Sequence, residues 1–185
     1  MFVCAGNNET FSFATPIGVG LEESAINLTR LALFDKPEFL IFIGSAGSYG
    51  KYKIFDVVES MIGSNIELGF WQNQCYTPID NVIEAKQIKD VSQKTDIIVN
   101  SSNYITIDEN ISKHYLKHNI HLENMEFFSV MKVAQEFEIP VLGIFVVTNY
   151  TNKDAHKDFL QNHSKAKEIL VKYIEDKYKE LKKGT

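Results

Sequence analysis

The chain has 185 residues and a formal net charge of −5, with 24 acidic residues against 19 basic ones. This length suits a single domain spanning residues 1–185, and such a domain buries about 70% of the surface that its unfolded form exposes. The acidic balance gives no reason to expect a nucleic-acid partner.

The two cysteines and the hydropathy pattern favour a cytoplasmic protein. Cys4 and Cys75 lie far apart in the chain and show no metal-ligand spacing, so we expect reduced thiols and no bound metal. No stretch reaches the roughly 18 apolar residues that a membrane span needs. We therefore expect no membrane partner.

Two short strands, residues 2–5 and 10–14, are the first predicted elements. The turn 6–9 between them is rich in Asn and Gly, so a hairpin is expected. Apolar residues at helical spacing then predict a helix from Leu21 to Phe34. Residues 39–43 are uniformly apolar, as in a strand that is covered on both faces.

The small residues from Gly44 to Gly50 follow this strand directly and predict a loop. A buried strand that ends in such residues can bring backbone amides close to a ligand. The pattern makes Gly44, Ser45, Ala46 and Gly47 candidates for holding an anion, a water or a sugar. An ordinary tight turn is the alternative from this pattern alone.

The rest of the chain alternates strands with helices, although residues 63–94 give no clear pattern. In chain order, the sequence predicts strands at 54–58 and 95–99, a helix from the capping box 106–109 to about 118, an extended segment at 120–123, a helix from about 124, a strand at 141–147 and a last helix from about 164. This order indicates an α/β layered fold.

Three segments, taken in order, resemble the nucleoside phosphorylase and nucleosidase superfamily. They are Pro16–Gly20 before a helix, Gly44–Gly47 after a strand, and Asn124–Glu126 followed by a strand that ends in Thr148–Asn149. The resemblance implies a three-layer α/β/α domain around a central mixed, partly barrel-like sheet. Matched without a gap, residues 2–14 correspond to the family's second and third strands, so the first strand-helix unit is expected to be missing.

The resemblance assigns catalytic roles to Glu126 and Asn149. Glu126 would accept hydrogen bonds from both ribose hydroxyls above Met125, Asn149 would bond N7 and O6 of a 6-oxopurine, and Tyr104 would stack on the base. The residues alone leave plainer alternatives open. Glu126 can simply favour a helix N-terminus, Met125 can fill the core, Asn149 can be a turn residue and Tyr104 can pack on the surface.

The resemblance also implies cleavage of the N-glycosidic bond of a purine nucleoside, a small-molecule partner. The leading hypothesis is phosphorolysis of a 6-oxopurine nucleoside to base and ribose 1-phosphate, with phosphate as co-substrate and no cofactor. Ser45 and the amides of Gly44 to Gly47 would face phosphate or the attacking water, and His156 and Lys157 lie in a predicted loop. A homodimer or a higher homo-oligomer is expected, because relatives complete their sites across a dimer interface.

Hydrolysis is the rival hypothesis. Arg30 is the chain's only arginine, and Phe42 stands near the place where many phosphorylases have a phosphate-binding arginine. In nucleosidases the unit that is expected to be missing supplies the acidic residue that activates water, and Asn124 replaces the first glutamate of the family's Glu-Met-Glu. A non-catalytic nucleoside binder or oligomer partner is therefore a third possibility.

Overall fold

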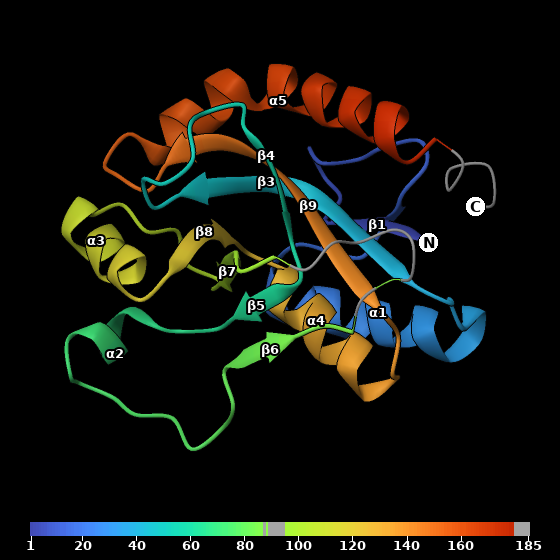
Figure 1. Ribbon diagram of the computed structural model, residues 1–185, viewed down its shortest axis with the longest axis horizontal. Coiled ribbons are helices and arrows are strands. Elements are labelled where there is room, and N and C mark those ends of the chain that lie inside the picture. Colours follow the sequence, from blue (N-terminus) through green and yellow to red (C-terminus); the bar gives the residue numbers. More distant parts are fainter. Residues whose placement is uncertain (87, 89–94, 180–185) are drawn as a thin grey trace.

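The computed structural model describes residues 1–86, 88 and 95–179 (Figure 1). The helices of these residues are α1 (Gly20–Asp35), α2 (Leu68–Trp71), α3 (Glu109–Lys117), α4 (Phe127–Glu136) and α5 (Ala155–Lys177). The strands are β1 (Phe2–Cys4), β2 (Thr15–Pro16), β3 (Leu40–Ser48), β4 (Val57–Ser60), β5 (Ile62–Ser64), β6 (Val82–Glu84), β7 (Ile98–Ser101), β8 (Ile120–Asn124) and β9 (Val141–Tyr150).

A mixed sheet forms the middle layer, in the order β2-β1-β3-β8-β7-β5-β6, and β9 pairs with both β3 and β4. Helix α5 covers one face of the sheet along β9 and β3, whereas α1 and α4 pack together on the opposite face (Figure 1). The predicted α/β/α fold with a mixed sheet is confirmed. No helix in the described ranges is both long enough and apolar enough to cross a bilayer.

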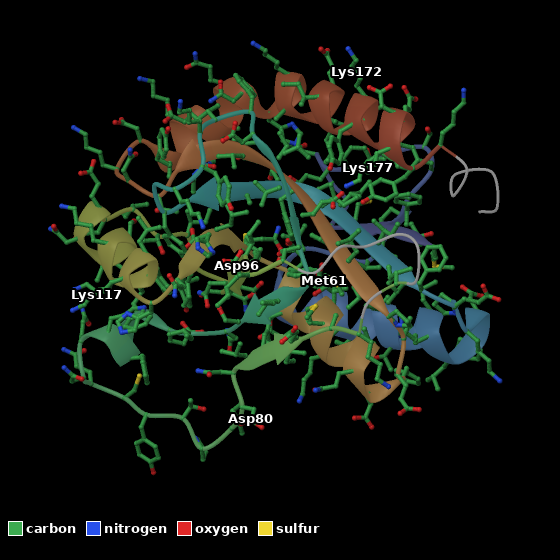
Figure 2. The ribbon with its side chains drawn as sticks, in the orientation of Figure 1. Met61, Asp80, Asp96, Lys117, Lys172 and Lys177 are labelled. Carbon is green, nitrogen blue, oxygen red and sulfur yellow. The ribbon has the colours of Figure 1, made fainter. Side chains whose placement is uncertain are left out.

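Helix α5 shows how the charged side chains are divided between solvent and sheet. Lys172 lies on its exposed side, while Lys177 bonds the carboxylate of Glu59 at 2.8 Å (Figure 2). The buried side chains Ala166, Leu170 and Ile174 of this helix are spaced four residues apart and pack on the sheet. The apolar stripe thus explains why α5 lies flat on β9 and β3.

Several predicted elements are confirmed. Helix α1 occupies Gly20–Asp35 and buries Leu28 and Ala32 from the predicted stripe. Strand β9 is buried from Val141 to Asn149, as expected for an apolar strand that is covered on both faces.

The predicted hairpin at the start of the chain is wrong. Strand β1 pairs in parallel with β2 and with β3, and residues 10–14 form no strand. Gly6 and Glu9 close a tight turn through a hydrogen bond from the Glu9 amide to the Gly6 carbonyl, at 2.8 Å. Local turn chemistry predicted this turn correctly, but β1 pairs with β2 and with the distant buried strand β3, and not with residues 10–14.

The predicted loop after residue 43 is also wrong, because β3 runs on through Gly44 to Ser48. Strand β9 pairs with β3 along its whole length, with one irregularity between Ala46 and Gly47. A buried strand with a continuous neighbour tolerates glycine, since the backbone ladder holds it. The amides of Gly44 to Gly47 therefore belong to a strand and not to an anion-binding loop.

Other helices and strands begin or end at residues that differ from the predicted ones. Helix α3 is capped by Asp108, which accepts a hydrogen bond from the Asn110 amide, and not by Thr106 as predicted. The last helix begins at Ala155, well before the predicted residue 164. Strands β4 and β7 overlap the predicted strands 54–58 and 95–99 only at one end.

One edge of β3 is shared by two different strands. Strand β1 pairs with Ile41 and Phe42 in parallel, and β8 pairs with Gly47 and Ser48 in the antiparallel sense. Between them the backbone of Ser45 bonds side chains instead of a strand. The sheet therefore opens at this point, and the cavity described next lies there.

Candidate active site

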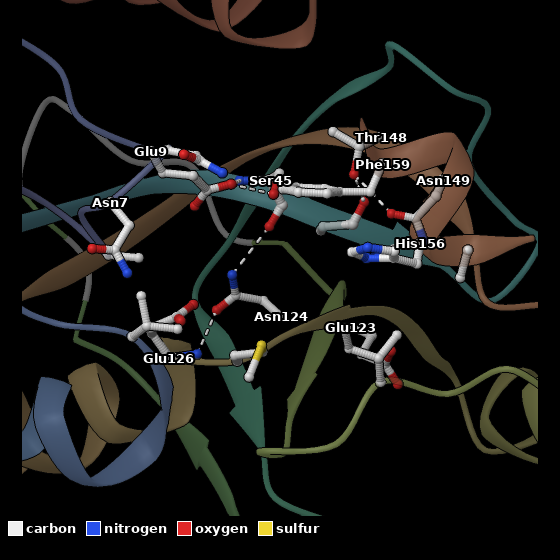
Figure 3. Close-up of a pocket in the computed structure, with 18 of the residues that line it drawn as sticks. Asn7, Glu9, Ser45, Glu123, Asn124, Glu126, Thr148, Asn149, His156 and Phe159 are labelled. Carbon is white, nitrogen blue, oxygen red and sulfur yellow. Dashed lines mark hydrogen bonds between the residues drawn. The ribbon is translucent and has the colours of Figure 1, made fainter. Parts of the chain in front are cut away.

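The opening beside β3 is a cavity of about 310 Å³, which is within the range of small-molecule sites (Figure 3). The ends of β1, β3, β8 and β9 and the start of α5 contribute to its lining. Its main polar groups are Glu9, Ser45, Asn124, Glu126, Asn149 and His156. The structure thus brings the sugar-binding candidate Glu126 and the base-binding candidate Asn149 into one cavity.

Glu9 enters the cavity from the turn after β1. Its Oε1 accepts a hydrogen bond from the Ser45 amide at 3.0 Å and a second from the Ser45 hydroxyl. Gly44 makes this approach possible, because a Cβ there would lie 3.2 Å from Glu9 Oε2. One oxygen of Glu9 is thereby fixed by β3, and among the described residues no hydrogen-bond donor occupies the other, which remains for a ligand.

Asn124 links β3 to the start of α4. Its Nδ2 donates to the Ser45 carbonyl at 3.1 Å, and its Oδ1 accepts from the amides of Glu126 and Phe127, each at 2.9 Å (Figure 3). An Asn oxygen that accepts from two amides at a helix start acts as a cap. Asn124 thus positions Glu126, a task for which an amide suffices.

Glu126 is a deeply buried acid of the cavity. It is only 3% exposed, and its Oε1 accepts a hydrogen bond from the Gly20 amide at 3.0 Å. Burial, helped by the nearby charge of Glu9, raises the pKa of Glu126 to about 7, against the lowering effect of the Gly20 hydrogen bond. A carboxylate held in this way can accept hydrogen bonds from sugar hydroxyls.

Asn149 lies at the end of β9 with a defined amide orientation. Thr148 Oγ1 donates to Asn149 Oδ1 at 2.8 Å, and Asn149 Nδ2 donates to the Tyr150 carbonyl at 3.1 Å. The amide nitrogen carries two hydrogens, so one is available to a ligand. Gly47 leaves space in front of this amide, because a Cβ there would lie 3.1 Å from Asn149 Nδ2.

The other predicted site residues divide into two groups. Met125, Ser45, Ala46 and Gly47 line the cavity. Gly44 and Tyr104 do not line it, and the side chain of Tyr104 is 75% exposed.

The neighbour of Tyr104, Ile105, lines the cavity instead. His156 and Lys157 lie in the first turn of α5 and not in a loop, and His156 lines the cavity.

Glu9, Glu123 and Phe159 are among the cavity residues that sequence reasoning missed. Burial raises the pKa of Glu123, against the lowering effect of hydrogen bonds from Thr106 and Tyr49. The only sequence signal for Glu9 is an acidic residue directly after a short apolar strand. In the described ranges no cluster of His, Cys, Asp and Glu side chains could hold a metal ion.

Comparison with known proteins agrees with this geometry. The family model of the phosphorylase superfamily matches residues 94–176. A futalosine hydrolase mutant of Helicobacter pylori strain 26695 superposes with a TM-score of 0.78 at 15% identity, covering 97% of each chain. The chain has the fold of the nucleoside phosphorylase and nucleosidase superfamily. The resemblance drawn from the sequence is thereby confirmed.

Two nucleosidases show the same fold. The 5'-methylthioadenosine/S-adenosylhomocysteine nucleosidase of Helicobacter pylori, with a bound butyl-thio-DADMe-Immucillin-A, gives a TM-score of 0.76 at 17% identity over 90% of this chain and 79% of that one. The MTA/SAH nucleosidase of Streptococcus pneumoniae, in complex with 8-aminoadenine, gives a TM-score of 0.72 at 15% identity over 92% of this chain and 94% of that one. No curated protein matches the sequence.

Proposed function

We propose that the protein hydrolyses the N-glycosidic bond of a purine nucleoside, with water and not phosphate as the nucleophile. The observation that carries this proposal is the carboxylate of Glu9, held by Ser45 in the same cavity as Glu126. A carboxylate with one free oxygen can accept a proton from water. The similar solved structures of nucleosidases and of a futalosine hydrolase support hydrolysis.

The charges of the cavity favour water over phosphate. Glu9 and Glu126 both line it, and two carboxylates repel a phosphate dianion. Arg30, the chain's only arginine, lies on the exposed side of α1, so no bidentate guanidinium is available to hold phosphate. The amides of Gly44 to Gly47 that were expected to bind an anion belong to a paired strand, and the Ser45 amide among them donates to Glu9.

Each step of the proposed reaction has a residue in place. Glu9 takes a proton from water as the water oxygen bonds to C1′ of the ribose and the bond from C1′ to the base nitrogen breaks. Ionised Glu126 holds the ribose hydroxyls and stabilises the positive charge that develops on the sugar. Asn149 donates a hydrogen bond to N7 of the departing base, and the proton on Glu9 returns to that base through solvent.

Asn149 also favours a 6-oxopurine over an aminopurine. An amide can donate to N7, but it cannot supply a proton as a carboxylic acid can. A hypoxanthine or guanine leaving group needs less help from a proton donor at this position than adenine does. Inosine and guanosine are therefore the proposed substrate class.

The direct experiment measures hypoxanthine release from inosine by the purified protein, with and without phosphate. We expect equal rates in both conditions and free ribose as the second product. Release that requires phosphate, with ribose 1-phosphate as product, would establish phosphorolysis instead. Heat stabilisation by inosine without any product would establish a non-catalytic binder.

We also propose that the protein forms a homodimer or a higher homo-oligomer. Supporting this, Tyr104, Ile105 and Ile107, in the segment between β7 and α3, are 75%, 49% and 63% exposed, and Ile105 also lines the cavity. Exposed apolar side chains close together in the chain suit a protein interface. Light scattering is expected to give at least twice the chain mass, and Ile107→Glu to lower it. A monomeric mass for the wild-type protein would contradict the proposal.

A further inference from the structure

Helix α1 has no cap of its own and takes one from a distant segment. Its N-cap residue is Val19, whose side chain cannot accept a hydrogen bond. The first backbone amides of a helix have no partner within the helix. Asn103, in the segment between β7 and α3, supplies an acceptor, because its Oδ1 accepts from the Leu21 amide at 2.9 Å. Asn103 therefore caps α1, although it lies 82 residues further along the chain.

The capped amide directly follows the one that bonds the candidate sugar-binding carboxylate. The Gly20 amide donates to Glu126 Oε1 at 3.0 Å, and the next amide, that of Leu21, donates to Asn103. Gly20 has a φ of +84°, a conformation that glycine shares with many others of similar energy. The residue itself does not fix the direction of its amide, so contacts on either side must do so.

The backbone at the start of α1 leaves room for Asn103. A Cβ at Gly20 would lie 2.8 Å from Asn103 Oδ1, which is too close for a carbon atom. The other end of the same amide is also bonded, because Asn103 Nδ2 donates to Glu22 Oε2 at 2.8 Å. Both polar atoms of this side chain thus join the segment after β7 to the first turn of α1.

The acidic surroundings explain why an amide suits this position. Glu22 and Glu23 stand in the first turn of α1, and Glu9 acts on Glu126 from the turn after β1. In the described ranges no ion pair joins Glu126 to a cation. An aspartate at position 103 could also cap the helix, but it would add a negative charge beside Glu22. Asparagine supplies the acceptor without that charge.

We propose that Asn103 is a positioning residue for the sugar site, because its cap on α1 keeps the Gly20 amide on Glu126. This inference rests on the proposed function, in which ionised Glu126 holds the ribose. A hydrogen bond to a carboxylate favours its ionised form. Loss of the cap should therefore leave less Glu126 ionised at neutral pH.

The test measures kcat/KM for inosine against pH in the wild-type protein, Asn103→Ala and Asp108→Ala. Asp108 Oδ1 accepts from the Asn110 amide at 2.7 Å at the start of α3, so the control loses the same kind of cap on another helix. In Asn103→Ala the rise of kcat/KM should move up by about one pH unit, which gives a loss of about five-fold at pH ~7 and almost none at pH ~9.5. The control should keep the wild-type midpoint.

A merely structural role would give a different result. An unchanged midpoint in Asn103→Ala, an equal loss at every pH, or the same shift in Asp108→Ala would overturn the inference.

A titration without substrate separates this inference from the proposed function. The carboxyl carbon of Glu126, assigned in carbon-13 NMR spectra with Glu126→Gln, should titrate about one pH unit higher in Asn103→Ala than in the wild-type protein. A raised midpoint in a protein that cleaves no nucleoside would remove the hydrolase and keep the role of Asn103. Hydrolysis with an unchanged midpoint would do the reverse.

Hydrogen exchange on the wild-type protein decides the case in which Asn103→Ala fails to fold. The amides of Gly20 and Leu21 should have equal protection factors, as expected of groups that open together. A Gly20 amide that stays protected while the Leu21 amide exchanges would show that Asn103 does not hold it, and would overturn the inference.

Discussion

Replacing Glu9 with Gln is expected to lower kcat for inosine hydrolysis by about a thousand-fold, while inosine still binds. A general base contributes roughly 10² to 10⁴ to the rate, and Gln keeps the shape and the hydrogen bonds of the Ser45 amide and hydroxyl but cannot take a proton from water. Steady-state rates of hypoxanthine release, together with calorimetric binding of inosine, separate these two effects.

Glu136→Gln is the matched control for this variant, because it makes the same chemical change at an exposed position of α4. Its kcat should equal that of the wild-type protein. If Glu9→Gln keeps more than about a tenth of the activity, Glu9 is not the general base, and water must be activated elsewhere in the cavity. Loss of inosine binding in this variant would instead indicate a structural role.

Glu126 should make the activity depend on pH near neutrality. The pKa of Glu126 is raised to about 7, and only the ionised form accepts hydrogen bonds from both ribose hydroxyls. We therefore expect kcat/KM to rise with pH through about 7 and then to level off. Glu126→Gln should lose about a hundred-fold in kcat/KM and should no longer show this rise.

The same carboxyl should lower the stability of the fold at alkaline pH. Its pKa rises from 4.5 to about 7 on folding. Its favourable contribution to the free energy of unfolding is therefore complete below about pH 4.5 and is lost as the pH rises through about 7. Glu126→Gln should therefore be more stable than the wild-type protein at pH 8, by about 2 kcal/mol, and equally stable near pH 4.5.

Urea unfolding at the two pH values measures this difference. If Glu126→Gln were less stable than the wild-type protein at pH 8, the ionised Glu126 carboxylate would not destabilise the fold.

The sequence predicted the elements whose own residues carry a clear pattern. Helix α1 and strand β9 are examples, because their apolar residues follow the period of a helix and of a doubly covered strand. Glu126 and Asn149 were placed in one site through the family motifs at the ends of β8 and β9. That prediction depended on motif order and not on any local preference.

The features of the fold and the site that were not predicted depend on contacts that sequence patterns do not record. Ser45 and Glu9 are 36 residues apart in the chain, and no periodicity connects them. Gly44 was interpreted as a loop residue, but the neighbouring strand β9 holds it in a ladder. Thr106 resembled a helix cap, yet its amide and hydroxyl bond the buried Glu123 instead. In each case tertiary contacts overrode local propensity.

The interrupted edge of β3 separates the chemistry of this protein from its scaffold. Glu9 lies on the short turn after β1, whereas Glu126 is positioned by Asn124 at the start of α4. Substitutions in this turn could change the nucleophile without changing how Glu126 binds the ribose. A single architecture could in this way give rise to enzymes that share a substrate and differ in the co-reactant that they consume.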